Sequence, residues 1–202
     1  MDFSYNIIPN QLNLFDWDTY YQYDGEIEIG VTNAITGEIE YLDGLTMGKD
    51  CMMIRASCAI PLVFPEMKID EIPYYDGGLA NAIPINRAIE KGYDKHVLVL
   101  TRPPSYVKTA GKGNKMMVRL LKKKYPNLVK QLQTRAARYN DTMKEIHQLE
   151  QEGKVFIFKP EYALKSFEGK VDIMQRNYDM GYRHAKERMA ELKTFINYEV
   201  KE

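Results

Sequence analysis

The opening part of the chain alternates apolar and polar residues in a way that is typical of β-strands. Residues 26–33 place their apolar side chains on one face, and residues 38–42 repeat the pattern. Between the two runs the segment ITGE carries Gly37, which is a turn signal at hairpin spacing. The pattern therefore predicts an antiparallel pair of strands.

The segments that follow alternate between helical and strand-like patterns. Residues 48–59 end before Pro61, and residues 84–91 begin with a proline and stop at Gly92, so both segments are predicted to be helices. Residues 96–100, HVLVL, form a continuous apolar run, as in a parallel-sheet strand that is buried on both faces. A helix followed by such a strand predicts a layered α/β fold.

The sequence pattern becomes mainly helical after Thr101. Apolar residues at helical spacing predict helices over residues 114–124, 128–152 and 172–198. One short apolar run predicts a buried strand over residues 155–158. We therefore divide the chain into an α/β core, residues 1–101, and a mainly helical, basic extension, residues 102–202.

Length and composition fit a globular protein, with 202 residues of which 45% are hydrophobic and 28% charged. Such a chain is expected to bury about 70% of its unfolded surface, so folding requires no metal or disulfide. Cys51 and Cys58 stand about 10 Å apart in a predicted helix, too far for a disulfide, and we interpret both as core residues. Two such thiols and no apolar leader predict a cytoplasmic protein, and no apolar run is long enough for a membrane-spanning helix.

The net charge of zero conceals two halves of opposite sign. Up to Thr101 there are 16 acidic and 6 basic residues, whereas the rest of the chain has 12 acidic and 22 basic ones. Residues 102–138 contain 11 Lys or Arg and no acidic residue, and we call them the basic stretch. Its first interpretation is that these charges are solvated or pair with the acidic half. Peripheral attachment to an anionic membrane is the second, and nucleic acid is disfavoured. The membrane candidates are Lys108, Lys112, Lys115, Arg119, Lys122, Lys123 and Lys124.

The motif Asp76-Gly77-Gly78 is the main candidate for chemistry. It follows an extended path set by prolines, the last of them Pro73, and it precedes a helix and strand, so we expect it on a connection at one edge of the sheet. An aspartate followed by two glycines suits a general base, because the glycines let another loop come close to the carboxylate. The alternative is a simple turn, for which these dipeptides are common. The three histidines are isolated from one another, so no metal or cofactor site is predicted.

Three segments around this motif resemble the patatin-like phospholipase family in order and spacing. They are SCAIPLVFP at residues 57–65, YYDGGL at residues 74–79, and NAIPINRAIEKGYDKHVLVLTRP at residues 81–103. The hairpin at residues 30–44 and the helical region after Thr101 also resemble parts of bacterial members. The resemblance implies an incomplete patatin-like layered α/β core and a lipid acyl hydrolase with a Ser-Asp dyad that uses no cofactor.

Within this resemblance Asp76 matches the dyad aspartate, with Gly77 and Gly78 shaping the site. The family's nucleophile stands upstream, in a Gly-x-Ser-x-Gly elbow. The serines of this chain, none of which has glycine on both sides, are Ser4, Ser57, Ser105 and Ser166. No nucleophile is therefore assigned, and Ser57 is interpreted as a helix-packing residue.

Two functional hypotheses follow. In the first, the chain is the C-terminal portion of a patatin-like lipid ester hydrolase, through truncation, gene splitting or a misplaced start, and it is inactive alone because the attacking atom is missing. In the second, it is a non-catalytic module derived from the fold, which binds a membrane or a protein partner. The sequence indicates no oligomeric state.

Overall fold

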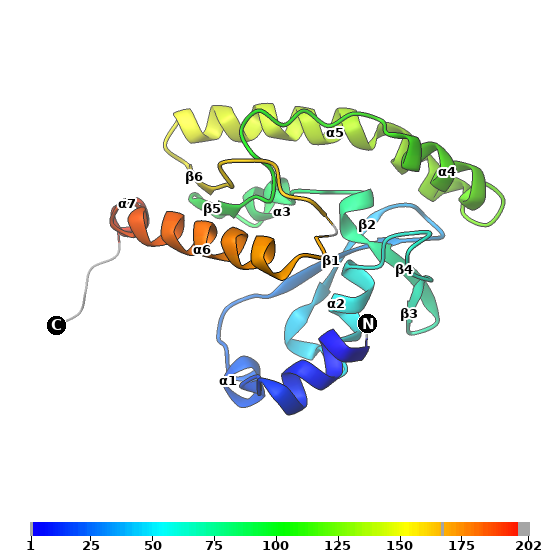
Figure 1. The fold of residues 1–202 in the computed structure, drawn as a ribbon. Helices are drawn as coiled ribbons and strands as arrows, with labels where there is room; N and C mark the ends of the chain where they lie inside the picture. Colours follow the sequence, from blue (N-terminus) through cyan, green and yellow to red (C-terminus); the bar gives the residue numbers. More distant parts are fainter. Residues whose placement is uncertain (1, 167, 198–202) are drawn as a thin grey trace. The chain divides into compact units, whose positions relative to one another are not determined.

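The computed structural model describes residues 2–166 and 168–197, and for residues 112–114 it describes the backbone only. Helices combine with two small sheets, one of four strands and one of two (Figure 1). The predicted α/β class is confirmed at this level.

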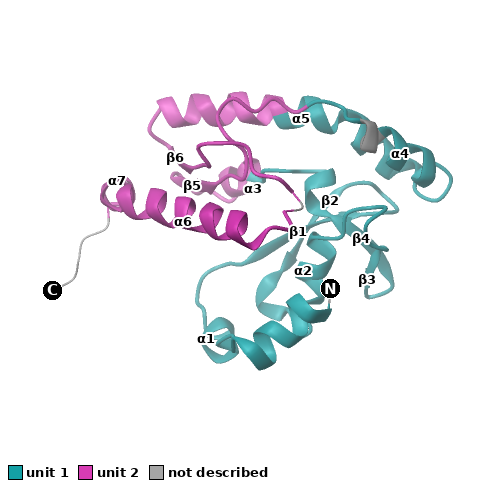
Figure 2. Cartoon of the chain, viewed as in Figure 1, with its two compact units in different colours: residues 1–84, 109–139 teal, residues 85–108, 140–202 magenta. Residues whose placement is uncertain are grey.

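The chain forms two compact units, each made of two stretches (Figure 2). Unit 1 comprises residues 1–84 and 109–139, and unit 2 comprises residues 85–108 and 140–202. Our division of the chain after Thr101 stays a prediction. The two units are described in turn.

The sheet of unit 1 is antiparallel, with strand order β2-β1-β4-β3. Its strands are β1 (Glu28–Asn33), β2 (Ile39–Asp43), β3 (Met67–Ile69) and β4 (Ile72–Asp76). The predicted hairpin of β1 and β2 is confirmed, and Gly37 occupies its turn with φ +78°. Glycine suits this position because a side chain is strained in the left-handed region.

A second hairpin is formed by β3 and β4 in the segment for which the prolines predicted an extended path. Ile69 pairs with Ile72, and the two turn residues between them, Asp70 and Glu71, have φ +48° and +64°. Pro73 lies inside β4, where its carbonyl oxygen accepts a hydrogen bond from the Ala34 amide at 2.9 Å. Both strands are extended, as the prolines predicted, but the sequence analysis did not predict that they pair with each other.

Helices cover much of the rest of unit 1: the π-helix η1 (Phe3–Leu12), α1 (Trp17–Tyr21), the 3-10 turns η2 (Gly44–Thr46) and η3 (Gly77–Leu79), α2 (Met52–Ser57), α4 (Lys112–Leu121) and the first part of α5 (Pro126–Gln151). The predicted helices over residues 48–59, 114–124 and 128–152 are thus confirmed with shifted ends.

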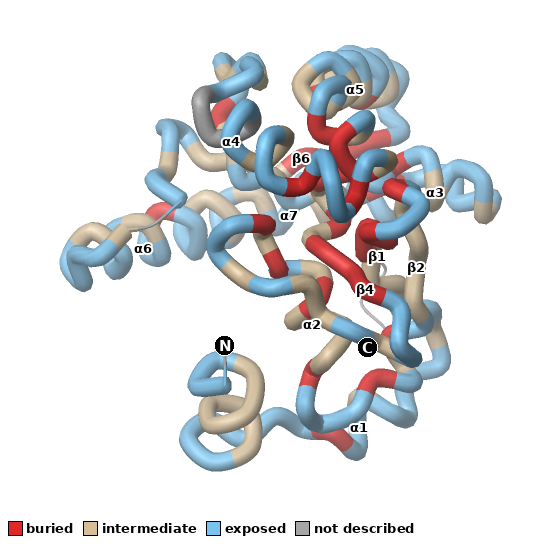
Figure 3. The backbone as a smooth tube through the Cα atoms, turned by 90° about the vertical axis from the view of Figure 1, so that its right-hand side faces the viewer, coloured by how far each residue is buried: buried red, intermediate tan, exposed pale blue. Residues whose placement is uncertain are grey.

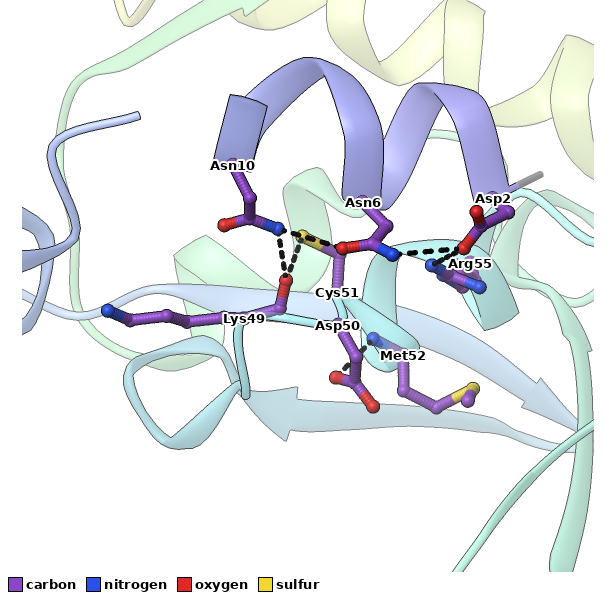
Figure 4. Close-up of polar contacts among 8 residues, drawn as sticks. All are labelled: Asp2, Asn6, Asn10, Lys49, Asp50, Cys51, Met52 and Arg55. Atoms are coloured by element: carbon purple, nitrogen blue, oxygen red, sulfur yellow. Dashed lines mark hydrogen bonds and ion pairs between the residues drawn. The ribbon is translucent and has the colours of Figure 1, made fainter. Parts of the chain in front are cut away.

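The two cysteines flank α2 and have different environments. Cys51 is buried, and burial raises the pKa of its thiol, whereas Cys58 is exposed, so placing Cys58 in the core was wrong. The α2 segment is tied to η1 by polar contacts, shown in Figure 4. Asn10 donates to the Lys49 carbonyl at 3.2 Å, and Arg55 lies 3.6 Å from the Asp2 carboxylate.

The core of unit 1 joins the sheet to α4 and α5. Figure 3 shows β1 and β4 among the buried segments. The main cluster of buried side chains comprises Ala34, Ala59, Tyr75, Leu79, Leu121, Tyr125, Leu128, Val129 and Leu132. The residues on either side of Asp76-Gly77-Gly78 therefore pack against the start of α5.

Unit 2 contains a parallel pair of strands and several helices, among them the second part of α5. Its other elements are α3 (Ile85–Glu90), β5 (His96–Val99), β6 (Val155–Phe158), α6 (Val171–Glu187) and α7 (Met189–Phe195). The helix predicted over residues 84–91 and the two strands are confirmed. Burial of β5 on both faces was wrong, because Val97 and Val99, which share one face, are 43% and 76% exposed. Among the described residues, β6 is the strand that pairs with β5.

The single long helix predicted over residues 172–198 is divided in two at Arg188. This residue leaves helical geometry at φ −93° and ψ +5°. Its guanidinium donates to the Ile157 carbonyl at 2.6 Å and lies over the Phe156 ring. These contacts with β6 stabilise the break, and Tyr198 lies outside the described residues.

Candidate functional site

Asp76 ends β4 and caps the turn η3 that follows. Its backbone amide donates to the Ala59 carbonyl at 2.9 Å, and its carbonyl accepts from the Thr32 hydroxyl at 2.8 Å. The side chain is partly buried, and Oδ1 accepts a hydrogen bond from the Gly78 amide at 2.7 Å. The carboxylate is thus fixed by its own turn, at the end of a strand that lies between β1 and β3 in the sheet.

Gly77 is required by a close approach between two backbones. A Cβ atom built on this residue would lie 2.3 Å from the carbonyl oxygen of Gly30 in β1, far inside van der Waals contact. The same oxygen accepts a hydrogen bond from the Ser57 hydroxyl at 2.8 Å. Ser57 therefore has a structural partner, in agreement with its interpretation as a packing residue.

Two arginines that the sequence reasoning did not single out bind the turn from α5. Arg135 Nε donates to the Gly78 carbonyl at 2.7 Å, and Arg138 Nη2 donates to the Leu79 carbonyl at 2.8 Å. Burial, together with the charge of Arg135, lowers the pKa of Arg138. In the sequence both residues belong to the basic stretch, and no local pattern distinguishes them from solvated lysines.

The two tyrosines before Asp76 each bind a carboxylate. Tyr74 donates to Glu40 at 2.6 Å, and burial and this bond raise the pKa of Tyr74 to about 12. Tyr75 donates to Glu66 at 3.2 Å, and burial and this carboxylate raise its pKa to about 12. Both phenols are therefore neutral at physiological pH and act as hydrogen-bond donors that hold β4 in place.

The contact between Glu66 and Lys124 gives unit 1 an acid-sensitive site. The hydrogen bond from Lys124 lowers the pKa of Glu66 from 4.5 to about 2. Because the folded-state pKa is depressed, the stabilisation is present above about pH 4.5 and is lost as the pH falls toward 2. We expect thermal melts between pH 6 and 2 to show a smaller acid-induced fall in Tm for Glu66→Gln than for the wild-type chain.

Glu71→Gln is the matched control, since Glu71 pairs with Lys68 at 3.3 Å but is 91% exposed. It should follow the wild-type profile. If Glu66→Gln and the wild-type chain lose stability in parallel, the ion pair does not control the acid response.

The remaining candidates of the sequence analysis are placed as follows. Ser4 lies in η1, whereas Ser105 and Ser166 belong to unit 2. Within the described part of the chain, no three His, Cys, Asp or Glu side chains gather as a metal site would require. No helix among the described residues is both long and apolar enough to cross a membrane.

The basic stretch is divided between paired and exposed side chains. Lys124 is paired with Glu66, which fits the interpretation of internal pairing. Lys115, Arg119, Lys122 and Lys123 are exposed, and Lys108 is partly buried. The Lys112 side chain lies outside the described atoms.

Comparison with known families gives two partial matches. Residues 50–89, which contain Asp76-Gly77-Gly78, match the family model of patatin-like phospholipases. Residues 125–197 match a domain of unknown function, DUF6363, and this segment includes the whole of α5. No curated protein matches the chain. The resemblance to the patatin-like family is thus confirmed over a short segment that ends in α3 and includes the candidate aspartate.

Proposed function

We propose that this chain supplies the base of a lipid acyl hydrolase with a Ser-Asp dyad, and that Asp76 is that base. The family match over residues 50–89 supports the hydrolase class. The observation that carries the assignment is the geometry of Asp76, whose Oδ1 is held by the Gly78 amide at 2.7 Å while the side chain keeps some exposure. A carboxylate fixed in this way is ready to accept a proton without a change of rotamer.

In the proposed reaction Asp76 accepts the proton of a serine hydroxyl as the oxygen attacks the acyl carbonyl of a lipid ester. A water molecule deprotonated by the same carboxylate then attacks the acyl-enzyme and releases the fatty acid. The serine is proposed to come from a segment that contains a Gly-x-Ser-x-Gly elbow, since none of the serines of this chain has two flanking glycines. The chain alone is accordingly expected to be inactive.

Asp76→Asn is the sharpest test of this function, because the amide oxygen still accepts the Gly78 hydrogen bond but no longer binds the proton. The variant is made in the chain joined to a patatin-like segment that carries a Gly-x-Ser-x-Gly elbow, and hydrolysis of a nitrophenyl acyl ester and of a phospholipid is measured. We expect the rate to fall by about 10²- to 10⁴-fold.

Asp70→Asn serves as the matched control. Asp70 is exposed, stands in the turn of the same hairpin, and has a positive φ that asparagine tolerates. It should leave the rate unchanged. Equal rates for Asp76→Asn and the unmodified enzyme would remove Asp76 from the mechanism.

The exposed face of α4 favours a second candidate function, attachment to an anionic lipid surface. Met116 and Leu120 are 59% and 55% exposed one helical turn apart, and the exposed cations Lys115 and Arg119 stand on the same helix, with the exposed Lys123 in the turn that follows it. The opposite side packs on the core through Met117, Val118 and Leu121. An amphipathic helix with apolar and basic residues on one exposed face is typical of interfacial binding.

We expect the chain to cosediment with vesicles of anionic phospholipid, more weakly at high salt, and several-fold more weakly after Met116→Ser combined with Leu120→Ser. Val171→Ser combined with Met174→Ser removes two exposed apolar side chains from α6 and is the control. Equal binding to anionic and zwitterionic vesicles, or an equal loss in both double variants, would contradict this role of α4.

A further inference from the structure

The turn η3 has backbone acceptors that the short turn itself leaves unpaired. Its three residues, Gly77–Leu79, form one 3-10 turn, in which the Gly77 carbonyl accepts from the Ala80 and Asn81 amides at 3.2 and 2.9 Å. The next two carbonyls have no following helical turn to bind. They are the groups that Arg135 and Arg138 reach from α5, at 2.7 and 2.8 Å.

Placing these two cations there is costly, so a specific gain is required to offset it. The residues are three positions apart on α5, where like charges repel. Both side chains are partly buried, and burial with the neighbouring charge lowers the pKa of Arg138. Charge-assisted hydrogen bonds to backbone carbonyls are strong enough to provide that gain.

The same turn brings Arg135 near the carboxylate. A Cβ built on Gly78 would lie 3.0 Å from Asp76 Oδ1 and 3.6 Å from an Arg135 terminal nitrogen. Gly78 therefore separates the carboxylate from the guanidinium without inserting a side chain. Its amide holds Asp76, and its carbonyl is held by Arg135.

We propose that Arg135 and Arg138 are positioning residues for Asp76, acting through the carbonyl groups of Gly78 and Leu79. This assigns a role to the start of the segment that matches DUF6363: it clamps the turn that carries the aspartate of the patatin-like segment. The catalytic consequence rests on the proposed function, whereas the clamp itself does not depend on it.

Amide hydrogen exchange of the 202-residue chain tests the clamp directly. We expect exchange at the Gly78 and Asn81 amides to accelerate about tenfold or more in Arg135→Met and Arg138→Met. Lysine at position 135 keeps a charge and one donor, so Arg135→Lys should recover most of the protection. Lys130→Met removes an exposed cation from the same helix, where the Lys130 ammonium donates to Asn127, and should change nothing.

A measurement on the unmodified chain covers the case in which the methionine variants do not fold. The Nε proton of Arg135 is expected to exchange slowly enough to give a resolved NMR signal, with the exposed Arg119 as the internal reference. The clamp is refuted if the Arg135 proton exchanges as fast as that of Arg119, or if the two methionine variants keep wild-type protection at Gly78.

Steady-state kinetics distinguish the proposed function of Asp76 from the positioning role of the arginines. They are measured in the chain joined to the segment that carries the nucleophile. Loss of positioning predicts that both methionine variants lower kcat about tenfold or more with KM unchanged, and that Arg135→Lys restores it. If Asp76→Asn abolishes hydrolysis while the arginine variants keep full kcat, the positioning role is wrong and the proposed function stands. If Asp76→Asn is fully active, the proposed function fails, and the clamp is judged on exchange alone.

Discussion

Gly77→Ala is expected to lower the free energy of unfolding by about 3 kcal/mol. The added Cβ would lie 2.3 Å from the Gly30 carbonyl oxygen and 2.7 Å from its carbon, and both atoms belong to the backbone of β1. A side chain could rotate away from such a clash, but a strand held between two partners cannot. Relief would require η3 to move and would weaken the hydrogen bonds of Thr32 and Ala59 with Asp76.

Urea denaturation of the 202-residue chain measures this loss. Gly181→Ala is the control, because Gly181 lies within α6 with no atom near the added Cβ, and alanine is the better helix former. That variant should be as stable as the wild-type chain or more so. If the two alanine variants unfold at the same urea concentration, β1 and η3 are not in the close contact described.

Leu132→Ala is expected to cost about 3 kcal/mol of stability, because it empties space at the centre of unit 1. Leu132 is fully buried and belongs to the cluster that includes Tyr75 and Leu79, the residues on either side of the candidate site. The loss of stability has two parts: the transfer free energy of the removed methyl groups, and the energy of the cavity that the rigid sheet cannot close.

The same denaturation experiment checks this effect, with Leu120→Ala as the matched substitution. Leu120 is 55% exposed on α4, so its truncation should change the unfolding midpoint little. A midpoint for Leu132→Ala within experimental error of that for Leu120→Ala would show that the start of α5 does not pack on the sheet as described.

The sequence pattern predicted the elements that are determined by residues close together in the chain. The alternation over residues 26–42 and the turn glycine Gly37 were sufficient for the first hairpin, and VFIF was sufficient for β6. The second hairpin was missed because its turn uses Asp70 and Glu71 at positive φ, where glycine or asparagine is the usual signal. The short strands on either side of this turn are too brief to show a period.

The other differences come from tertiary contacts, which a single sequence does not display. An apolar run such as HVLVL looks the same whether one or both faces are covered, so the exposure of Val97 and Val99 could not be foreseen. The break at Arg188 depends on the carbonyl of Ile157 in a distant strand.

The residues of the candidate site also fall into those that the sequence predicted and those that it did not. Asp76 was found from its two glycines and their surroundings, because that signal lies within three residues. Arg135 and Arg138 were not found, because their partners are 57 and 59 residues away in the chain. Within a run of basic residues, the local sequence pattern is the same for an arginine that binds a backbone carbonyl and for one that faces water.

The hydrogen bond to the Gly30 carbonyl gives Ser57 a structural role that has nothing to do with attack on an ester. The pairing of β1 with β4 ends at Val31 and Asp76, so the preceding carbonyl would lack a donor if the Ser57 hydroxyl did not supply one. Position 57 therefore selects for a small side chain with a hydroxyl group, as a substitute for the missing strand residue. A serine at this position in a related chain would be explained by the need for a donor to the carbonyl at position 30, and it would not by itself indicate a nucleophile.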